Sequence, residues 1–485
     1  MTFLRAFYKK NNAGYLLIAL PVMAAEWILF KCLYPFADYF TDSYSYIEAA
    51  AQRDVIGYRP MGYSIFLRII HAIWASDTFL VTLQYVLVQG ACLGLFFAVI
   101  NQCRPGRLAA LLLLGCMLLN PAIPYLCNYV SSDALFVGLS LIWLTVLMGM
   151  LREPSLWRMI LQVVLLFAIF NTRYVALFYP VVAVLAFLLL RKKVSPVFKL
   201  TGIAASIGVV VLCTAWIKHL TYKETGVNMF SAFSAWQIAG NALHIYPYIP
   251  VDTNDLPSPE CRELAGYVQV YFDSPAARPA GGIPAPTDYM WLRNSPLHLY
   301  MADLRKKERV SYFIAWNRVG PVFSQYGYLL IRRHPVAFAR YYGWMSLQTF
   351  FLAPLDVFGE YNMGSASFDP VAKNWFRYSG VRGRVWSVTA QGKLLAPMPW
   401  IYLLLNGLFV VVSVLFLRSR GLRERHPVFT GFLELAVAYL VSNACFSIFA
   451  TPTIFRYQLL PMVLLFVFSG VGIALIAQSR TREIV

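Results

Sequence analysis

Repeated apolar runs of about 20 residues constrain this chain more than any of its other features. A helical run of that length matches the hydrocarbon thickness of a lipid bilayer. Hydrophobic residues make up 59% of the 485 residues and charged residues only 13%, against roughly 45–50% and about 25% in soluble domains. The sequence therefore predicts an all-α polytopic membrane protein.

The positions of the runs predict about ten transmembrane helices. Seven precede residue 219 and three follow residue 398. We predict a seven-helix membrane module at 1–218 with a first outer loop at 36–77, an extracytoplasmic segment of mixed structure at 219–398, and three helices with a short tail at 399–485. The predicted spans are 14–35, 78–100, 107–126, 132–151, 157–170, 174–190, 197–218, 399–417, 428–450 and 456–478.

Basic clusters predict the orientation, because Lys and Arg are enriched in cytoplasmic loops. Lys9 and Lys10 place the N-terminus in the cytoplasm, and alternation places the cluster at 191–193 there too. Counting 334–354 as a further span would move the arginines of 418–425 outside. We therefore interpret it as an in-plane or re-entrant helix, which also keeps the C-terminus cytoplasmic. The formal charge of +18 fits such loops and anionic lipids better than nucleic acid.

Two acids stand at the predicted outer ends of spans. Asp42 precedes a stretch, 43–54, that can form an amphipathic helix, and Asp133 opens the fourth span. Either acid can be a helix N-cap, and Ser45 with Glu48 resembles a capping box. Either carboxylate can equally act as a general base or bind a cation. The sequence leaves these alternatives open.

Three arginines are predicted at the same membrane face as the acids. Arg173 lies in the short turn between the fifth and sixth spans, where a snorkelling side chain is the alternative. Arg456 begins the last span on the outer side, where an arginine usually pairs with an acid or a phosphate. Arg59, held extended by Pro60, can be a further anion ligand. Guanidinium groups can form paired hydrogen bonds with a phosphate. Since the two acids and three arginines are predicted at the same membrane face, together they predict one site for a phosphate-containing ligand.

Several common signatures are absent from the sequence, among them HExxH, GxSxG and the P-loop. An ATP-driven pump is therefore disfavoured. The six histidines show no metal-ligand spacing. Glu26 lies within the first span and should face the interior of the bundle, in either a structural or a cavity-lining role. The long outer segment contains aromatic-rich runs at 230–248 and 289–300.

The first outer loop resembles that of the GT-C superfamily of glycosyltransferases, in the run DSYSYIEAAAQRDVIGYRPMGYSIFL. This superfamily includes the bacterial relatives of protein O-mannosyltransferases and the lipid A aminoarabinose transferase. Asp42 matches the family's acidic residue, and 58–70 its second juxtamembrane helix. SSDALF, with Asp133, resembles the acidic step at the fourth span, and FRYQLLP, with Arg456, the Arg-Tyr-…-Pro of the last span. Arg173 matches a common arginine before the sixth span.

The run HPVAFARYYGW resembles the family's late juxtamembrane segment, but the chain departs from the family pattern in two ways. A single acid precedes Ser43 where many relatives have an adjacent pair. The resemblance therefore implies no particular cofactor and leaves a divalent cation open. The segment 219–398 matches none of the acceptor-binding domains known in the family, so the acceptor is left open as a glycan, a lipid or a protein.

The resemblance implies an inverting glycosyltransferase of a bacterial inner membrane, acting outside the cytoplasm on a polyprenyl-phosphate sugar donor and an acceptor hydroxyl. Asp42 would be the general base, and Arg59, Arg173 and Arg456 would bind the donor phosphate. Asp133 would support the arginines or hold a cation. Membrane lipids are the other expected partners. No nucleic-acid partner is expected. The sugar and acceptor pocket would include Asp38, Tyr44, Tyr46, Tyr58, Tyr63 and Tyr457.

Other functions stay open from the sequence. A transporter or flippase of lipid-linked saccharides would show inverted repeats and ionisable groups at the bilayer midplane, where only Glu26 is found. A polymerase or ligase of such saccharides would rely on Arg305, His334 and Arg340 in the long outer segment. In a purely structural membrane protein, the gathering of acids and arginines at one face would be incidental.

Overall fold

The computed structural model describes residues 12–190, 194–274, 288–380, 383, 385–450 and 453–484, the side chains of 480–484 excepted. Within these ranges the chain forms helices, and its one β contact is an isolated bridge between Asp38 and Tyr129. Lys9, Lys10 and the cluster at 191–193, which support the predicted orientation, lie outside the described residues. The all-α fold class is confirmed for the described part of the chain.

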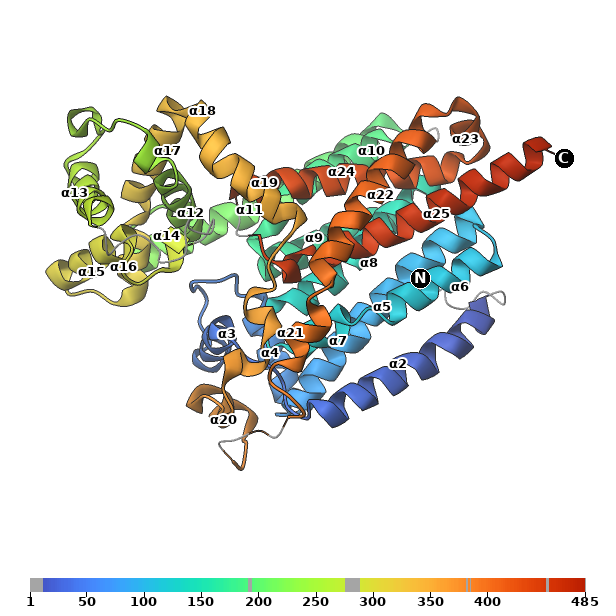
Figure 1. The fold of residues 1–485 in the computed structure, drawn as a ribbon, viewed down its shortest axis with the longest axis horizontal. Coiled ribbons are helices and arrows are strands. Elements are labelled where there is room, and N and C mark those ends of the chain that lie inside the picture. Colours follow the sequence, from blue (N-terminus) through green and yellow to red (C-terminus); the bar gives the residue numbers. More distant parts are fainter. Residues whose placement is uncertain are drawn as a thin grey trace.

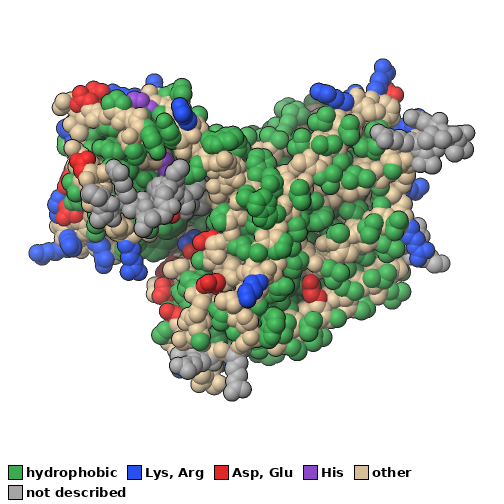
Figure 2. Space-filling model, viewed as in Figure 1, with side chains coloured by type: hydrophobic (Ala, Val, Ile, Leu, Met, Phe, Trp, Pro, Cys, Tyr) green, Lys and Arg blue, Asp and Glu red, His purple; other side chains and the backbone are tan. Residues whose placement is uncertain are grey.

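Eight helices among the described residues are long and apolar enough to cross a membrane. They pack into a bundle (Figure 1), and Figure 2 shows hydrophobic side chains over most of its visible face. The chain is therefore an integral membrane protein. The eight are α2 (Ala13–Leu33), α5 (Asp77–Cys103), α6 with α7 (Arg107–Asn128), α8 (Ser132–Arg152), α11 (Pro196–Thr225), α21 with α22 (Ala390–Arg418), α24 (Pro427–Ala450) and η9 with α25 (Phe455–Ser479).

Three predicted membrane segments are shorter than these eight. The fifth and sixth predicted spans are the apolar helices α9 (Leu156–Thr172) and η2 with α10 (Tyr174–Leu188). The total of ten spans therefore stays a prediction, and so does the in-plane or re-entrant position of 334–354. That segment comprises α18 (Pro335–Ala337), the π-helical turn η6 (Phe338–Gly343) and α19 (Trp344–Phe351).

The third predicted span is interrupted. It consists of α6 (Arg107–Leu118) and α7 (Ala122–Asn128), with Asn120 and Pro121 between them. Proline has no amide proton to donate and disfavours the helical conformation of the residue before it, which explains the break. After α7 the backbone is extended at Tyr129, and this residue forms the isolated bridge with Asp38.

The first outer loop contains two helices, as the sequence predicted. They are α3 (Thr41–Gln52) and α4 (Gly62–Ile73), which pack against each other at one end of the bundle. α3 ends where Arg53 adopts a left-handed conformation, with φ of 59°. The chain between the two helices carries Arg59. This loop is therefore a folded element on the end of the bundle.

A separate lobe of helices, comprising Ala232–Arg333, stands beside that same end of the bundle (Figure 1). It has its own hydrophobic core, in which Trp236, Phe323 and Tyr326 are buried. The indole N–H of Trp236 donates to the carbonyl of Trp316 at 3.2 Å, which ties two lobe helices together. The lobe helices are α12 (Ala232–Leu243), α13 (Pro259–Asp273), α14 (Asp288–Trp291), α15 (Pro296–Glu308), α16 (Tyr312–Arg318) and α17 (Gly320–Arg333).

The remainder of the long outer segment packs on the bundle. Phe358, Tyr361 and Phe376 belong to the same hydrophobic core as the membrane helices. The segment 219–398 therefore contributes to two cores, and its described residues contain helices and turns without a strand. Its last elements are η7 (Asp356–Gly359), η8 (Tyr361–Gly364), α20 (Pro370–Phe376) and α21 (Ala390–Leu395).

Glu26 faces the interior of the bundle, as predicted for an acid within a span. Its carboxylate accepts from the hydroxyl of Tyr85 at 2.6 Å and from the amide of Gln89 at 3.4 Å. Both partners belong to α5, so the contacts join α2 to its neighbour. Because Glu26 does not line the large cavity described below, the structural interpretation holds for it.

Candidate active site between the bundle and the lobe

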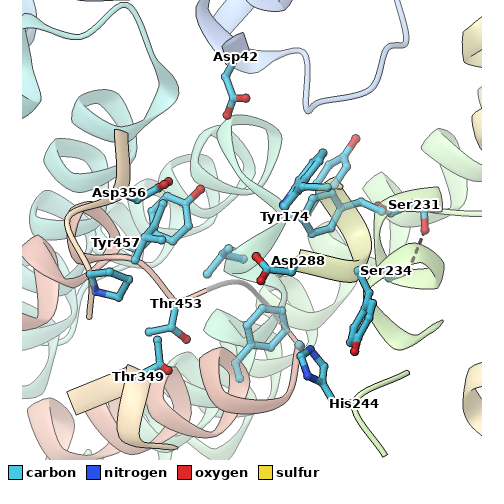
Figure 3. Close-up of a pocket in the computed structure, with 18 of the residues that line it drawn as sticks. Asp42, Tyr174, Ser231, Ser234, His244, Asp288, Thr349, Asp356, Thr453 and Tyr457 are labelled. Carbon is cyan, nitrogen blue, oxygen red and sulfur yellow. Dashed lines mark hydrogen bonds between the residues drawn. The ribbon is translucent and has the colours of Figure 1, made fainter. Parts of the chain in front are cut away.

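A cavity of about 2190 Å³ lies where the end of the bundle meets the lobe. Its bundle wall is built from α3, the chain before α4, the start of α8, η2 and the start of η9, and its opposite wall from lobe helices and α19. Figure 3 shows Asp42 pointing into this space from α3, opposite Asp288 of the lobe. All five predicted acids and arginines line it: Asp42, Arg59, Asp133, Arg173 and Arg456.

Local helix capping leaves Asp42 available to the cavity. Helix α3 begins at Thr41 with Phe40 as its N-cap residue, and the Ser43 hydroxyl accepts from the Phe40 amide at 3.1 Å. The N-cap interpretation of Asp42 is therefore wrong. The capping box of Ser45 with Glu48 is wrong as well, because the Ser45 hydroxyl donates to the Asp42 carbonyl at 2.8 Å. The Asp42 carboxylate instead pairs with Arg59.

Asp133 is also placed by a neighbouring serine. Ser131 is the N-cap of α8, where its hydroxyl oxygen accepts from the Asp133 amide at 3.4 Å. The same hydroxyl donates to the Asp133 carboxylate at 2.9 Å. Asp133 is thus not the N-cap residue that the sequence allowed. Its carboxylate is buried and pairs with Arg173, so the snorkelling alternative for Arg173 is not needed.

Arg456 joins the two acid–arginine pairs into one cluster. Its Nη2 lies 4.0 Å from Asp42 Oδ2, and its Nε lies 3.8 Å from Asp133 Oδ2. Arg59 holds Asp42 from one side and Arg173 holds Asp133 from the other. Segments far apart in the sequence therefore place three guanidinium groups and two carboxylates on one cavity wall.

The Arg456 guanidinium is buried with unused hydrogen-bond donors. Only 7% of the residue is exposed, and its Nε and Nη1 have no hydrogen-bond partner among the described residues. Nη2 donates to the hydroxyl of Tyr457 at 3.3 Å, and the guanidinium carbon lies 4.2 Å from the ring centroid of Phe40. Burying charged donors without acceptors is costly, so this group is suited to an anionic ligand in the cavity.

Gly62 allows the chain that carries Arg59 to lie beside the chain that carries Arg173. It is the first residue of α4, and a Cβ built on it would lie 2.6 Å from the carbonyl oxygen of Asn171, at the end of α9. Any side chain larger than that of glycine would clash with this backbone. The close contact of α4 with α9 therefore depends on Gly62.

We expect Gly62→Ala to destabilise the protein by about 1–3 kcal/mol, because the extra carbon meets rigid backbone. The midpoint of thermal unfolding of the purified protein measures this effect. Gly90→Ala is the matched control, since a Cβ there has nothing within 4 Å. Equal midpoints for the two variants would show that the contact of α4 with α9 is not close in the folded protein.

The predicted tyrosines form two groups, those that line the cavity and those that do not. Tyr46, Tyr58 and Tyr457 line the cavity, and the Tyr46 hydroxyl lies 2.9 Å from the Ser132 hydroxyl. Tyr44 does not, because two residues along α3 turn it about 200° away from Asp42. Tyr63 is fully buried and donates to Gln84 of α5 at 2.8 Å. Tyr44 and Tyr63 therefore lie outside the cavity that the other predicted tyrosines line.

Asp38, also predicted for the pocket, lies outside the cavity. It is buried, and its carboxylate accepts from the amide of Asn362 at 2.7 Å. Its own backbone pairs with the carbonyl of Asn128 and the amide of Val130. Asp38 thus joins the outer loop, α7 and η8. Burial raises the pKa of Asp38 to about 7, although the Asn362 amide opposes this shift.

This pKa makes the stability pH-dependent in a defined direction. The pKa of Asp38 is about 7 in the folded protein and has its usual value of 3.8 in the unfolded chain. Between these two pH values the folded state binds the proton more tightly than the unfolded state, so the contribution of Asp38 to stability falls as the pH rises. We expect the unfolding midpoint of the wild type to fall more over this range than that of Asp38→Asn. Parallel midpoints would contradict the burial of an ionisable group here.

Sequence reasoning missed the second wall of the cavity. That wall includes Tyr248, Asp288 and Trp291 of the lobe. Asp356, the first residue of η7, also lines the cavity and has a left-handed backbone, with φ of 51°. The dense aromatic runs were a signal, but nothing in them showed that they face the arginines. Arg340 lines the cavity, whereas Arg305 and His334, also considered for a polymerase or ligase, do not.

The described residues contain no group of three or more His, Cys, Asp or Glu side chains that could hold a metal ion. The two acids of the bundle wall are instead paired with arginines. Comparisons of the chain with protein-family models, with curated proteins and with solved structures found no match.

Proposed function

We propose that this protein is an inverting glycosyltransferase that moves a sugar from a polyprenyl-phosphate donor to an acceptor hydroxyl. The observation that carries the proposal is the buried Arg456 guanidinium, with unused donors, between the carboxylates of Asp42 and Asp133. It lies in a cavity large enough for more than one substrate, since small-molecule sites typically measure about 300–1,000 Å³. The GT-C resemblance of the first loop supports the same reaction.

The arginines suit the donor phosphate. Three guanidinium groups outnumber two carboxylates by one, and a phosphodiester carries one negative charge that would balance them. Arginine can donate paired hydrogen bonds to phosphate oxygens. When the bond between the sugar and the phosphate breaks, the leaving phosphate gains charge, and donors already in place stabilise it in the transition state.

Asp42 is the better placed of the two acids to act as general base. Its side chain is 19% exposed and that of Asp133 is 5% exposed. In the proposed reaction Asp42 accepts the proton of the acceptor hydroxyl, and the hydroxyl oxygen forms a bond to the anomeric carbon. The bond from that carbon to the phosphate oxygen breaks on the opposite side, which inverts the configuration. Asp133 positions Arg173 and Arg456.

The direction of the helices supports an extracytoplasmic site. α8 begins at the cavity and α24 ends near it, so the connections at their other ends lie at the opposite end of the bundle. Arg152, Arg158 and the arginine-rich helix α23 (Arg420–Arg425) belong to those connections. Basic connections usually lie in the cytoplasm by the positive-inside rule, which supports the proposal of an extracytoplasmic cavity and cytoplasmic termini.

The test is transfer of a labelled sugar by the purified protein in lipid nanodiscs. Polyprenyl-phosphate donors with different sugars are supplied with a crude extract of cell-envelope glycans, lipids and proteins as acceptors. We expect release of polyprenyl phosphate to depend on the protein. Movement of an intact lipid-linked saccharide between leaflets, without release of polyprenyl phosphate, would contradict the proposal and favour a flippase.

A further inference from the structure

The lobe gives the cavity a wall that donor binding does not use. The arginine cluster lies on the bundle wall, whereas the lobe wall is rich in aromatic side chains. Tyr248, Trp291, Tyr312 and Trp316 are among them, and all lie within the lobe. None of these four side chains carries a positive charge to balance a phosphate, so the wall suits a second ligand of different chemistry.

The aromatic rings present flat and accessible faces. Tyr248 is 54% exposed and Trp291 is 46% exposed, although both lie in a concave wall. The Tyr248 ring stacks on that of Tyr341, with centroids 3.8 Å apart and planes at 7°. Trp291 lies nearly parallel to Trp316 at 6.4 Å. Neighbouring rings thus support these side chains while part of each stays open to a ligand.

Polar groups are placed among the rings. Figure 3 shows Asp288, Ser231 and Ser234 around the same part of the cavity as His244. An aromatic face packs on the C–H face of a sugar ring, and carboxylates and hydroxyls accept from the sugar hydroxyls around its edge. A polyprenyl chain has no hydroxyls for these groups. Among the described residues of this part of the cavity, two acids, Asp273 and Asp288, outnumber one arginine, Arg340, so an anionic glycan would be disfavoured.

The aromatic wall reaches the arginine cluster. Tyr58, which directly precedes Arg59, has its ring 5.8 Å from that of Tyr312 and 5.1 Å from that of Phe313. A chain of sugar rings along the lobe wall would therefore end beside the Arg59–Asp42 pair. We infer that the lobe wall binds a neutral oligosaccharide, which is the acceptor of the transfer reaction. Its identity as acceptor rests on the proposed function, but its binding does not.

Binding can be measured without any donor. The full chain in nanodiscs is titrated with end-labelled linear tetrasaccharides of glucose, of mannose and of N-acetylglucosamine, and anisotropy reports the bound fraction. We expect at least one to bind, and Trp291→Ala and Tyr248→Ala to weaken it by about tenfold or more. Tyr328→Ala and Trp386→Ala are the controls, because these side chains are 62% and 63% exposed outside the cavity.

Two results would overturn the inference. One is that no tetrasaccharide of the panel binds at millimolar concentration. The other is that the cavity variants bind as tightly as the controls. Saccharide binding that depends on Trp291 in a protein that transfers nothing would refute the proposed transferase alone, so the two failures are distinguishable.

Discussion

Asp42→Asn is expected to lower the rate of sugar transfer by about 10²–10⁴, because positioned base catalysis contributes that much. The substitution keeps the size of the side chain and removes its ability to take a proton. Asp42 is the more exposed carboxylate of the cluster, and its removal leaves Asp133 paired with Arg173. The loss should appear in kcat at saturating donor and acceptor, with the donor still bound.

Glu48→Gln is the matched control for this experiment. Glu48 lies on the same helix, α3, and is exposed, but it does not line the cavity. This substitution also replaces a carboxylate by an amide and removes one negative charge. Because the change lies outside the cavity, we expect transfer to continue at the wild-type rate. If the Asp42 variant is folded and transfers sugar as fast as the Glu48 variant, Asp42 is not the base.

Removal of Arg456 is expected to have an effect of similar size. One preorganised donor to a developing oxyanion is commonly worth about 10²–10³ in rate, and Arg456 is the buried member of the cluster with two unused donor atoms. We expect Arg456→Gln to lower kcat/KM for the donor by about that factor. Arg456→Lys keeps the charge without the paired donors, so its kcat/KM for the donor should fall between those of Arg456→Gln and the wild type.

The control for the arginine series is Arg332→Gln, which removes the same group from an exposed position of the lobe. The two cluster acids keep their own arginines in the Arg456 variants, so the fold should persist, and a size-exclusion profile checks this. Wild-type donor kinetics in a folded Arg456→Gln protein would rule out a phosphate ligand at this position.

The sequence was sufficient to predict that the two acids and three arginines of the bundle wall lie together. Arg456 stands out because it begins an apolar span against the usual charge bias, and Asp133 and Arg173 follow from the ends of adjacent spans. Helix periodicity also predicts that Tyr46 shares the face of Asp42. These inferences depend on local patterns and membrane topology, which a single sequence records well.

Tertiary contacts decided what the sequence could not. Asp38 and Asp42 look alike as acids of one loop, but the amide of Asn362, more than 300 residues away, holds Asp38 outside the cavity. Tyr63 faces α5 for a similar reason, through Gln84. The lobe wall was missed because its residues meet the arginines only through the docking of a second core. Such contacts leave no periodic pattern in the chain.

The presence of two hydrophobic cores has a consequence for how this protein unfolds. Trp236 and its neighbours in the lobe belong to a different hydrophobic core from that of the bundle. We therefore expect lobe and bundle to unfold as separate cooperative units, with two transitions in a heating scan. The cavity takes its walls from both. A ligand that fills the cavity binds only while lobe and bundle are both folded. It should therefore raise the temperature of the lower unfolding transition toward that of the higher one.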